Sequence, residues 1–456
     1  MMKKLPTLIA IVCSCFCLCT CDIAGLKDKI EQEVAGASTN TTTYTVTYNA
    51  NGATGGSVPS DPNVYLQGAT ITVLANSGNL VEPNKGLAGW NTKPDGTGTG
   101  YADGNTFQMG PANVTLYALW GTKHVYIQGN VGTSSTSTVP VYWKDGVLNY
   151  LPASGGGSTS GIAHDNSGNV YISGAKGGQA GYWKNSNFIP LSLGQYAAGV
   201  VQGIAVDTTD NVWVLGSQGS PGSITCFYWK NSSGPYLLPG NIWQCVNVSP
   251  DSSGNVYIIG TAIVNGLYDL TAIWKNGSNP IVMAESSGTN GAWVGNQLAT
   301  DSSGNLYLCA VADSGPEYWK TVSGVWQGPF ALQYGTYTGA TATDIGVDSS
   351  GNLHVVGCWP MSGGPYTTLL YWQSASSAPT LISLPSGASV FWIGTSTFDT
   401  SGNFIFVGTA GTQEPGGKWA TITDGVPVCW VNGTPINLPM GSGNTWGCTG
   451  GVVVGP

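Results

Sequence analysis

Four tryptophans in the second half of the 456-residue chain are the side chains best suited to contact a ligand. Each precedes an Asp-containing turn motif, or its equivalent, by seven or eight positions: Trp243, Trp293, Trp392 and Trp446. Flat indole rings with neutral Asn and Ser residues beside them are suited to stacking on sugar rings. The alternative is that these rings pack inside the fold, so the sequence leaves carbohydrate binding and packing both open.

Six cysteines beyond residue 200 form a second set of reactive side chains: Cys226, Cys245, Cys309, Cys358, Cys429 and Cys448. Cys226 and Cys245 are separated by 19 residues, and so are Cys429 and Cys448. An even number of cysteines in an exported chain favours disulfides. We expect both pairs to form. For a third candidate pair, Cys309 and Cys358, pairing and free thiols are equally open.

The sequence lacks the usual patterns of catalytic and metal sites. Its three histidines, His124, His164 and His354, do not have the spacing of metal ligands. It has no Gly-x-Ser-x-Gly elbow and no phosphate loop, and its carboxylates are scattered. We therefore predict no catalytic residue, no metal and no cofactor, with a hydrolase or lyase as the lesser alternative.

Charge and composition exclude further classes of protein. All 14 basic residues are lysines, and 23 acidic residues bring the formal net charge to −9. A nucleic-acid-binding protein needs a basic surface that displaces counterions, so we expect no nucleic acid partner. The 68 glycines argue against a mostly helical chain, and the 17 tryptophans argue against disorder.

Two recurring motifs define the elements that would position these side chains. Asp-x-x-Gly-Asn, followed by a strand pattern, begins at Asp165, Asp251, Asp301, Asp348 and Asp399, and at Asp207 with Asp210 in place of Gly. An apolar residue (Cys in the last repeat) followed by Trp occurs at Trp143, Trp183, Trp229, Trp274, Trp319, Trp372 and Trp430. The Trp motif thus occurs once more than the Asp motif, and the chain ends on the strand-like run Val452–Val454.

These counts predict an all-β fold dominated by a seven-bladed β-propeller at residues 123–456. Each blade would have four strands, and the C-terminal strand would close the ring by completing the first blade. Six or eight blades are the alternatives. In the seven-bladed arrangement, a Cys429–Cys448 disulfide would staple the closure.

The repeats resemble those of NHL-type seven-bladed propellers, most clearly at 203–207 and 348–355. This resemblance implies an architecture and no particular activity, because the fold hosts many functions. We expect each motif Asp to accept hydrogen bonds from backbone N–H groups two and three residues on, with a calcium loop as the alternative. The motif tryptophans should fill the space between blades. Four lysines that each follow a motif Trp should mark a solvated face: Lys184, Lys230, Lys275 and Lys320.

A small β module is expected at residues 44–120, with strand patterns at 44–48, 71–74 and 114–120. Its motifs are Asn51-Gly52, Gly89-Trp90 with Thr92, and Thr115 to Trp120. They resemble the Listeria–Bacteroides repeat, also called the internalin B-repeat. The resemblance implies a β-grasp-like spacer or adhesive module of bacterial surface proteins. We expect Trp90 and Trp120 in its core.

The first 43 residues are typical of an export signal and a tether. In 1–21, Lys3-Lys4 precedes an apolar stretch that ends at Leu18-Cys19-Thr20-Cys21, as in a signal peptide. This end resembles a bacterial lipobox, which implies lipidation of Cys21, and an unlipidated secretory signal is the alternative. Residues 22–43 are expected to form a flexible tether.

These observations together predict an exported, lipid-anchored protein of the bacterial cell envelope or cell surface. Its expected role is binding or adhesion without catalysis. Carbohydrate binding by the four tryptophans is the first hypothesis, a scaffold for another protein the second, and a hydrolase or lyase the third. We expect a monomer attached to the membrane through its lipid, with a carbohydrate or protein ligand outside the cytoplasm.

Overall fold

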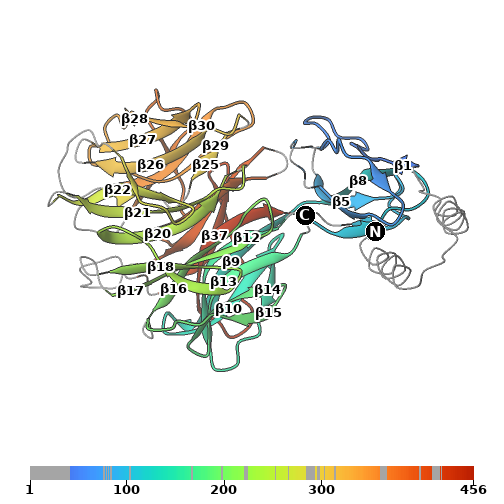
Figure 1. Cartoon of the computed structure of the whole chain (residues 1–456). Helices are drawn as coiled ribbons and strands as arrows, with labels where there is room; N and C mark the ends of the chain where they lie inside the picture. Colours follow the sequence, from blue (N-terminus) through green and yellow to red (C-terminus); the bar gives the residue numbers. More distant parts are fainter. Residues whose placement is uncertain are drawn as a thin grey trace, which may run out of the picture. The chain divides into compact units, whose positions relative to one another are not determined.

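The computed structural model describes residues 42–455 except 75, 77, 79, 81, 83–84, 102–103, 166–167, 197–198, 220–223, 252, 265–266, 284–292, 295–297, 302, 313–314, 360–366, 400–401, 413–421 and 423. Strands β1 to β37 make up the regular structure of this part, which contains no helix (Figure 1). Accordingly, no helix long and apolar enough to cross a membrane occurs among the described residues. The predictions for 1–21, for Cys21 and for 22–41 concern residues outside these ranges.

The chain divides into two compact units, 1–47 with 61–72 and 106–114, and 48–60 with 73–105 and 115–456. The division passes through the segment 44–120. In the first unit, β1 (Thr43–Tyr44) pairs with β3 (Tyr65–Leu66), and β4 (Thr70–Thr72) pairs with β7 (Thr106–Gln108).

A four-stranded sheet completes the module in the order β2-β8-β5-β6. Its strands are β2 (Val46–Asn49), β5 (Lys85–Asn91), β6 (Gly100–Tyr101) and β8 (Val114–Thr122). Trp90 is fully buried, with its ring 4.7 Å from that of Tyr48. Trp120 is partly buried and donates a hydrogen bond of 2.9 Å from Nε1 to the carbonyl of Asn51. Both rings therefore pack within the module, as predicted.

Residues 124–455 form seven further sheets in the described part of the chain, and each sheet is open. The first sheet contains β9 (His124–Ser134), β10 (Ser137–Lys144), β11 (Val147–Tyr150) and β37 (Trp446–Gly455), and the second contains β12 (Gly157–His164), β13 (Val170–Lys176), β14 (Gln179–Lys184) and β15 (Asn187–Pro190). The third contains β16 (Val200–Val206), β17 (Val212–Gln218), β18 (Thr225–Lys230) and β19 (Ser233–Leu237). The fourth contains β20 (Ile242–Pro250), β21 (Val256–Val264), β22 (Leu267–Lys275) and β23 (Ile281–Val282).

The last three sheets repeat the same antiparallel order. The fifth contains β24 (Trp293–Val294), β25 (Ala299–Thr300), β26 (Leu306–Ala312), β27 (Gly315–Val322) and β28 (Val325–Ala331). The sixth contains β29 (Thr341–Val347), β30 (Leu353–Trp359), β31 (Thr368–Trp372) and β32 (Thr380–Ile382). The seventh contains β33 (Val390–Phe398), β34 (Phe404–Gly411), β35 (Val426–Val431) and β36 (Thr434–Asn437). The predicted all-β fold is confirmed.

Each sheet has an edge strand on the same side of its strand order, and we call these the inner strands: β37, β12, β16, β20, β24 with β25, β29 and β33. Neighbours in this series contact one another from β37 to β20, and from β25 through β29 and β33 back to β37, whereas β24 contacts β21 and β22 of the preceding sheet. β37 also pairs antiparallel with β9, with Gly455 opposite His124 (Figure 1). The first sheet therefore contains strands from both ends of this region.

The seven motif tryptophans pack between successive sheets, as predicted. All are at most 2 % exposed. Each lies in an apolar cluster drawn from two sheets, and the cluster around Trp143 joins the seventh sheet to the first. Six indole N–H groups also donate to a carbonyl just beyond the outermost strand of the preceding sheet, in the pairs Trp143–Pro439, Trp183–Pro152, Trp229–Ser192, Trp274–Pro239, Trp372–Gln333 and Trp430–Ser383.

Six of the sheets have a glycine at the same position of the second strand, with alanine at 310 in the fifth. A Cβ at four of these glycines would lie within 3.3 Å of the motif Trp ring: Gly129, Gly216, Gly357 and Gly408. In the seventh sheet a Cβ at Gly408 would lie 2.0 Å from the carbonyl oxygen of Trp392 and 3.3 Å from the ring of Trp430. The inner strand that pairs with the second strand has a β-bulge just after the residue opposite this glycine. In the third sheet, for example, Val201 lies opposite Gly216, and the bulge falls between Val201 and Gly203. The sequence analysis missed this glycine, although it recurs five positions into the strand pattern.

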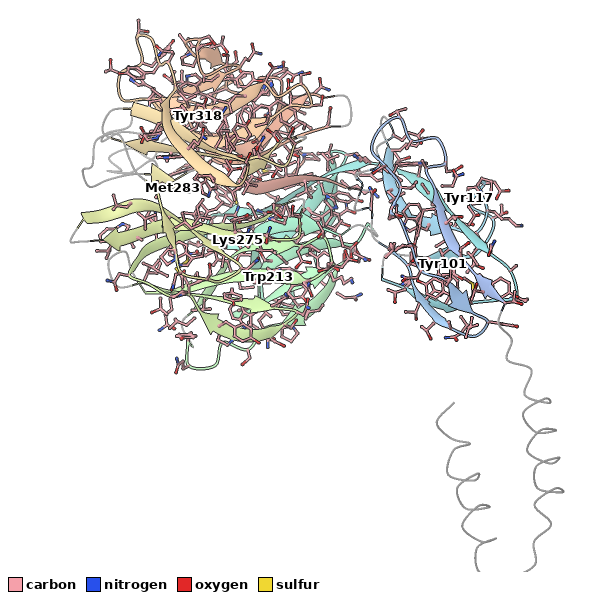
Figure 2. The ribbon with its side chains drawn as sticks, turned by 45° about the horizontal axis from the view of Figure 1, so that its top comes forward. Tyr101, Tyr117, Trp213, Lys275, Met283 and Tyr318 are labelled. Carbon is pink, nitrogen blue, oxygen red and sulfur yellow. A yellow bond between two sulfur atoms is a disulfide. The ribbon has the colours of Figure 1, made fainter. Side chains whose placement is uncertain are left out.

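The motif aspartates fix the turn between the first two strands of a sheet. Asp207 accepts hydrogen bonds at Oδ1 from the N–H groups of Thr209 (3.0 Å) and Asn211 (2.9 Å), and at Oδ2 from Nε1 of Trp213 (3.0 Å). Figure 2 labels Trp213 on β17. The turn interpretation therefore holds with one correction: the donors lie two and four residues on, because the Asn at the fourth position turns back into the strand. No group of three or more metal-ligating side chains occurs in the described ranges.

Candidate functional site

The structure places all four candidate tryptophans at the beginning of inner strands, at the end remote from the Asp turns. Trp392 on β33 is 48 % exposed. Trp446 on β37 is partly buried and donates from Nε1 to the carbonyl of Ile422 at 3.4 Å. Trp243 on β20 is partly buried. Trp293 begins β24, and its side chain lies outside the described residues.

Trp392 and Trp446 are on neighbouring inner strands. β33 borders β37, and the two backbones approach closely, since a Cβ at Gly394 would lie 2.5 Å from the carbonyl oxygen of Gly450. β20 borders β16 instead. We therefore define the Trp mouth as Trp392 and Trp446, with Trp243 as a separate position on the same end of the inner strands.

A cavity of about 180 Å³ lies between the inner strands and is lined by their second halves. Its polar lining is Ser160, His164, Asn247, Ser249 and Thr395, and the rest is mainly apolar side chains and glycine. None of the candidate tryptophans is among its described lining residues. The cavity and the Trp mouth therefore belong to opposite ends of the inner strands.

His164 is the single titratable side chain among the described lining residues of this cavity. Burial lowers the pKa of His164, which is therefore neutral near pH 7, and its Nδ1 lies 3.1 Å from the carbonyl oxygen of Asp165. Burial also lowers the pKa of Lys123, whose charge acts on His164. A catalytic acid and base pair in this cavity would need a second titratable group besides His164.

Polar side chains of the inner strands link one sheet to the next. The fully buried Asp344 on β29 accepts a hydrogen bond from the backbone N–H of Ser396 at 2.5 Å. Thr395 on β33 accepts one from Val452 on β37 at 3.0 Å. These residues carry no motif that the sequence analysis could use, because their role depends on a strand some 50 residues away. Their side-chain oxygens satisfy backbone N–H groups on the inner strand of the next sheet.

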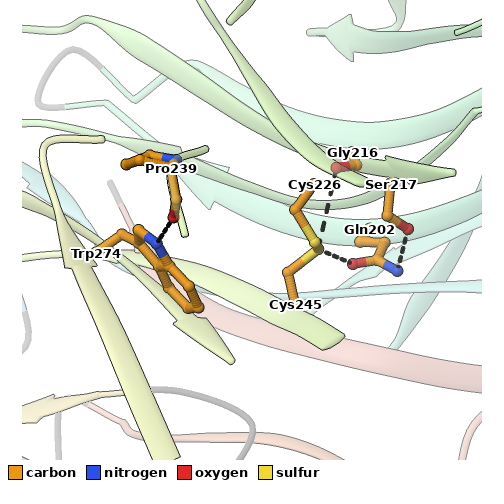
Figure 3. The surroundings of a disulfide bond; sticks show 7 residues. All are labelled: Gln202, Gly216, Ser217, Cys226, Pro239, Cys245 and Trp274. Carbon is orange, nitrogen blue, oxygen red and sulfur yellow. Dashed lines mark hydrogen bonds between the residues drawn. A yellow bond between two sulfur atoms is a disulfide. The ribbon is translucent and has the colours of Figure 1, made fainter. Parts of the chain in front are cut away.

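The predicted disulfide between Cys226 and Cys245 is present and links β18 to β20 (Figure 3). Both residues are buried in the apolar cluster between the third and fourth sheets, which also contains Trp274. The side chain of Gln202, hydrogen-bonded to Ser217, lies against the bridge (Figure 3).

The predicted disulfide between Cys429 and Cys448 is wrong, because both are free thiols, and Cys309 and Cys358, for which the sequence leaves pairing open, are free as well. Cys226 lies three residues before its motif Trp, whereas Cys429 lies one residue before Trp430. Two residues of strand displace a side chain by about 7 Å, beyond the reach of a disulfide. The same displacement separates Cys309 from Cys358. Cys309 lies one residue past the position opposite Trp319, whereas Cys358 lies three residues past the position opposite Trp372.

Comparison with known proteins identifies the N-terminal module. Residues 44–119 match the family model of the Listeria-Bacteroides repeat domain, which confirms the resemblance. A protein of Evansella cellulosilytica described as a Gly-rich membrane protein is 37 % identical over 93 residues, which are 19 % of this chain and 10 % of that protein. A second membrane protein of the same organism is 30 % identical over 102 residues, 22 % of this chain and 15 % of its own length. The chain thus spans a small part of these relatives.

Solved structures similar to this chain are β-propeller-like proteins. A streptogramin B lyase has a TM-score of 0.40 at 12 % identity and covers 72 % of this chain and 98 % of its own. A virginiamycin B lyase from Staphylococcus aureus has a TM-score of 0.38 at 13 % identity and covers 61 % and 93 %.

Proposed function

We propose that the seven sheets are the blades of a closed propeller whose ring is completed by β37. The seven apolar clusters support this arrangement, since each draws on two successive sheets and one joins the seventh to the first. The hydrogen bond from Trp143 to Pro439 repeats, across the two ends of the region, the bond found between other neighbouring sheets.

The propeller belongs to a binding or adhesion protein of the bacterial cell envelope, and it binds carbohydrate without catalysis at the Trp mouth. One observation carries this proposal: Trp392 keeps 48 % of its surface exposed, whereas the motif tryptophans of all seven sheets are at most 2 % exposed. A large aromatic ring left open on a rigid strand offers a stacking surface at low entropic cost. Trp446, which is partly buried, lies on the adjacent strand β37.

Attachment to the envelope is proposed through the lipidated Cys21, followed by the tether 22–43 and the Listeria-Bacteroides repeat. The lipobox-like Leu18 to Cys21 and the relatives described as membrane proteins support it. Metabolic labelling with an alkyne fatty acid tests it. We expect label on the wild-type chain and none on Cys21→Ala, and label that persists in the variant would exclude Cys21 as the anchor.

A glycan array tests the carbohydrate proposal. The exported chain with Cys21→Ser is screened, and hits are followed by titration of Trp fluorescence. We expect Trp392→Ala to weaken a hit at least tenfold and Trp446→Ala to weaken it less. Tyr236→Ala is the matched control, because Tyr236 is 46 % exposed but lies on the outer strand β19. Equal losses in Trp392→Ala and Tyr236→Ala would refute a site at the mouth.

A protein-binding scaffold is the second candidate function, favoured by apolar side chains on the outer strands. Val147, Val325, Leu381 and Ile436 are 49–64 % exposed on four different sheets. No charged residue occurs in the described outer strands, although charges usually protect an edge strand from pairing. A blank glycan array with a folded chain would favour this scaffold.

A further inference from the structure

A second cavity, of about 280 Å³, lies between the first and second sheets, and we call it the inter-sheet pocket. Tyr126, Tyr142 and Lys144 line it from the first sheet, and Trp183 and Ser186 from the second. Leu151, Gly168, Val170, Ile172 and Asn185 complete the lining. The pocket lies beside the Asp turns, so it is distinct from both the Trp mouth and the cavity between the inner strands.

The pocket exists because a contact that fills the same place between later sheets is missing here. Between the second and third sheets, Tyr182 precedes the motif Trp, and its hydroxyl is 3.1 Å from Oγ of Ser232. Between the third and fourth sheets, Tyr228 lies so close to Gly277 that a Cβ there would be 2.5 Å from its hydroxyl oxygen.

Tyr142 and Ser186 are the equivalent residues of the first interface, one before Trp143 and three after Trp183. No hydrogen bond joins them in the described part of the structure, and the space between the sheets stays open. Both hydroxyl groups are thereby available to a ligand.

The charge in the pocket comes from Lys144. Its ammonium lies 5.3 Å from the centre of the Tyr126 ring and has no ion-pair partner within the described ranges. The adjacent Asp145 is engaged elsewhere, since its carboxylate accepts the N–H of Val125 at 2.9 Å and contacts Nδ1 of His124 at 2.5 Å. The pocket therefore combines one uncompensated cation with aromatic walls.

We infer that the inter-sheet pocket binds a single sugar residue that carries a carboxylate, a hexuronic acid. Its ring packs on the tyrosine walls, its carboxylate pairs with the ammonium of Lys144, and its hydroxyls bond to Tyr142 and Ser186. The volume is just below the usual range of ligand pockets, about 300–1,000 Å³, which favours one sugar over an oligosaccharide. The ligand is a free uronic acid or the terminal residue of an acidic polysaccharide.

Isothermal titration of the full chain tests this site with glucuronic and galacturonic acid, a digalacturonic acid, and glucose as the neutral analogue. We expect saturable binding of a uronic acid, at least tenfold tighter than glucose and weakened by salt. Binding of the digalacturonic acid at least as tight as that of the monosaccharide identifies a chain end as the source. Tighter binding of the monosaccharide identifies the free acid.

The variants are Lys144→Met, which keeps the length of the side chain, and Lys184→Met as its matched control. Lys184 stacks on Tyr171 at 5.1 Å in the same way, but its interface is closed by the Tyr182–Ser232 contact. We expect Lys144→Met to lose the preference for a uronic acid over glucose and Lys184→Met to keep it.

Equal effects of the two variants, or no saturable binding of any uronic acid to a wild-type chain with native near-ultraviolet circular dichroism, would overturn the inference. Trp392→Ala separates this site from the Trp mouth. Unchanged uronic acid binding in that variant supports two independent sites, and its loss would overturn the assignment to the inter-sheet pocket.

Discussion

The indole Nε1 of Trp143 donates a hydrogen bond of 2.7 Å to the carbonyl of Pro439, 296 residues further along the chain. The bond connects the first sheet to the segment that leads into β37, the last strand. Trp183 makes the same bond to Pro152, only 31 residues away. The same local chemistry therefore joins sheets that follow one another in sequence and sheets from opposite ends of the region.

Trp143→Phe should destabilise the protein by about 1–3 kcal/mol, because it removes the donor and leaves the carbonyl of Pro439 without this partner. Trp183→Phe is the control for an interface between sheets close in sequence and should cost a similar amount. Equilibrium unfolding in urea measures both. A neutral Trp143→Phe beside a destabilising Trp183→Phe would contradict a structural role for the contact between the ends.

Gly408→Ala should destabilise by more than about 2 kcal/mol. The added methyl group would lie 2.0 Å from the carbonyl oxygen of Trp392, and only movement of the backbone relieves such a contact. Gly110→Ala is the control, because nothing lies within 4 Å of a Cβ there. Thermal unfolding of the two variants checks the prediction, which fails if their midpoints agree.

The Asp and Trp motifs were sufficient to predict the all-β fold and the burial of the motif tryptophans. Each motif determines structure over only a few residues, as a turn or a strand. The repeat of the motifs along the sequence is therefore also the repeat of the strands in the fold. The cysteines show where this reasoning fails. Cys226 and Cys429 each have a second cysteine 19 residues further on, yet their positions relative to the motif Trp of their strand differ by two residues. This position in the strand, and not the distance in sequence, decides which pair can form a disulfide.

The inter-sheet pocket could not be predicted from the sequence at all. Tyr142 and Tyr182 each begin a Tyr-Trp-Lys run, and Ser186 and Ser232 each end a Lys-Asn-Ser run. One pair leaves a cavity and the other closes it, because the distance between two packed sheets depends on many side chains at once. The exposure of Trp392 was equally unpredictable, since no sequence feature indicates that it is more exposed than Trp446.

Asp207→Asn should reduce stability at pH 7 by about 2 kcal/mol, since hydrogen bonds to a buried carboxylate are stronger than those to an amide. Burial alone raises the pKa of Asp207, but hydrogen bonds from Trp213, Asn211 and Thr209 lower it by more, so its pKa is below the ordinary value. A carboxyl group whose pKa is lower in the folded protein stabilises the fold at pH values above its pKa in the unfolded chain, about 3.9. This contribution is lost as the pH falls through the pKa of the group in the folded protein.

The difference between wild type and Asp207→Asn should therefore shrink as the pH is lowered from 7 to below 3. Thermal unfolding across this range measures it. A difference that stays constant with pH would show that the carboxylate charge contributes nothing.

Removal of the Cys226–Cys245 bridge by a double change to Ser should cost about 3 kcal/mol by loop entropy for a separation of 19 residues. The remaining buried thiols should be inert in the folded protein. Burial raises the pKa of Cys358 and Cys429 to about 12 and that of Cys309 as well, so each stays protonated at pH 8. Urea unfolding of the double variant measures the loss of stability. Peptide mapping without reduction, after alkylation in the folded state, tests the inertness of the thiols, which a linked Cys429–Cys448 peptide or an alkylated Cys309 would contradict.

Trp392→Ala should cost at most about 1.5 kcal/mol, while Trp430→Ala in the same sheet should cost about 3–5 kcal/mol. Trp430 is fully buried and its N–H donates to the carbonyl of Ser383, whereas half of the Trp392 surface is already in water. Urea unfolding of the two variants decides between the two interpretations of the mouth. A small loss of stability at Trp392 together with a large loss of carbohydrate affinity means that the ring is there for a ligand. Equal losses of stability at the two positions mean that Trp392 is a packing residue, and the proposed carbohydrate site then loses the observation that carries it.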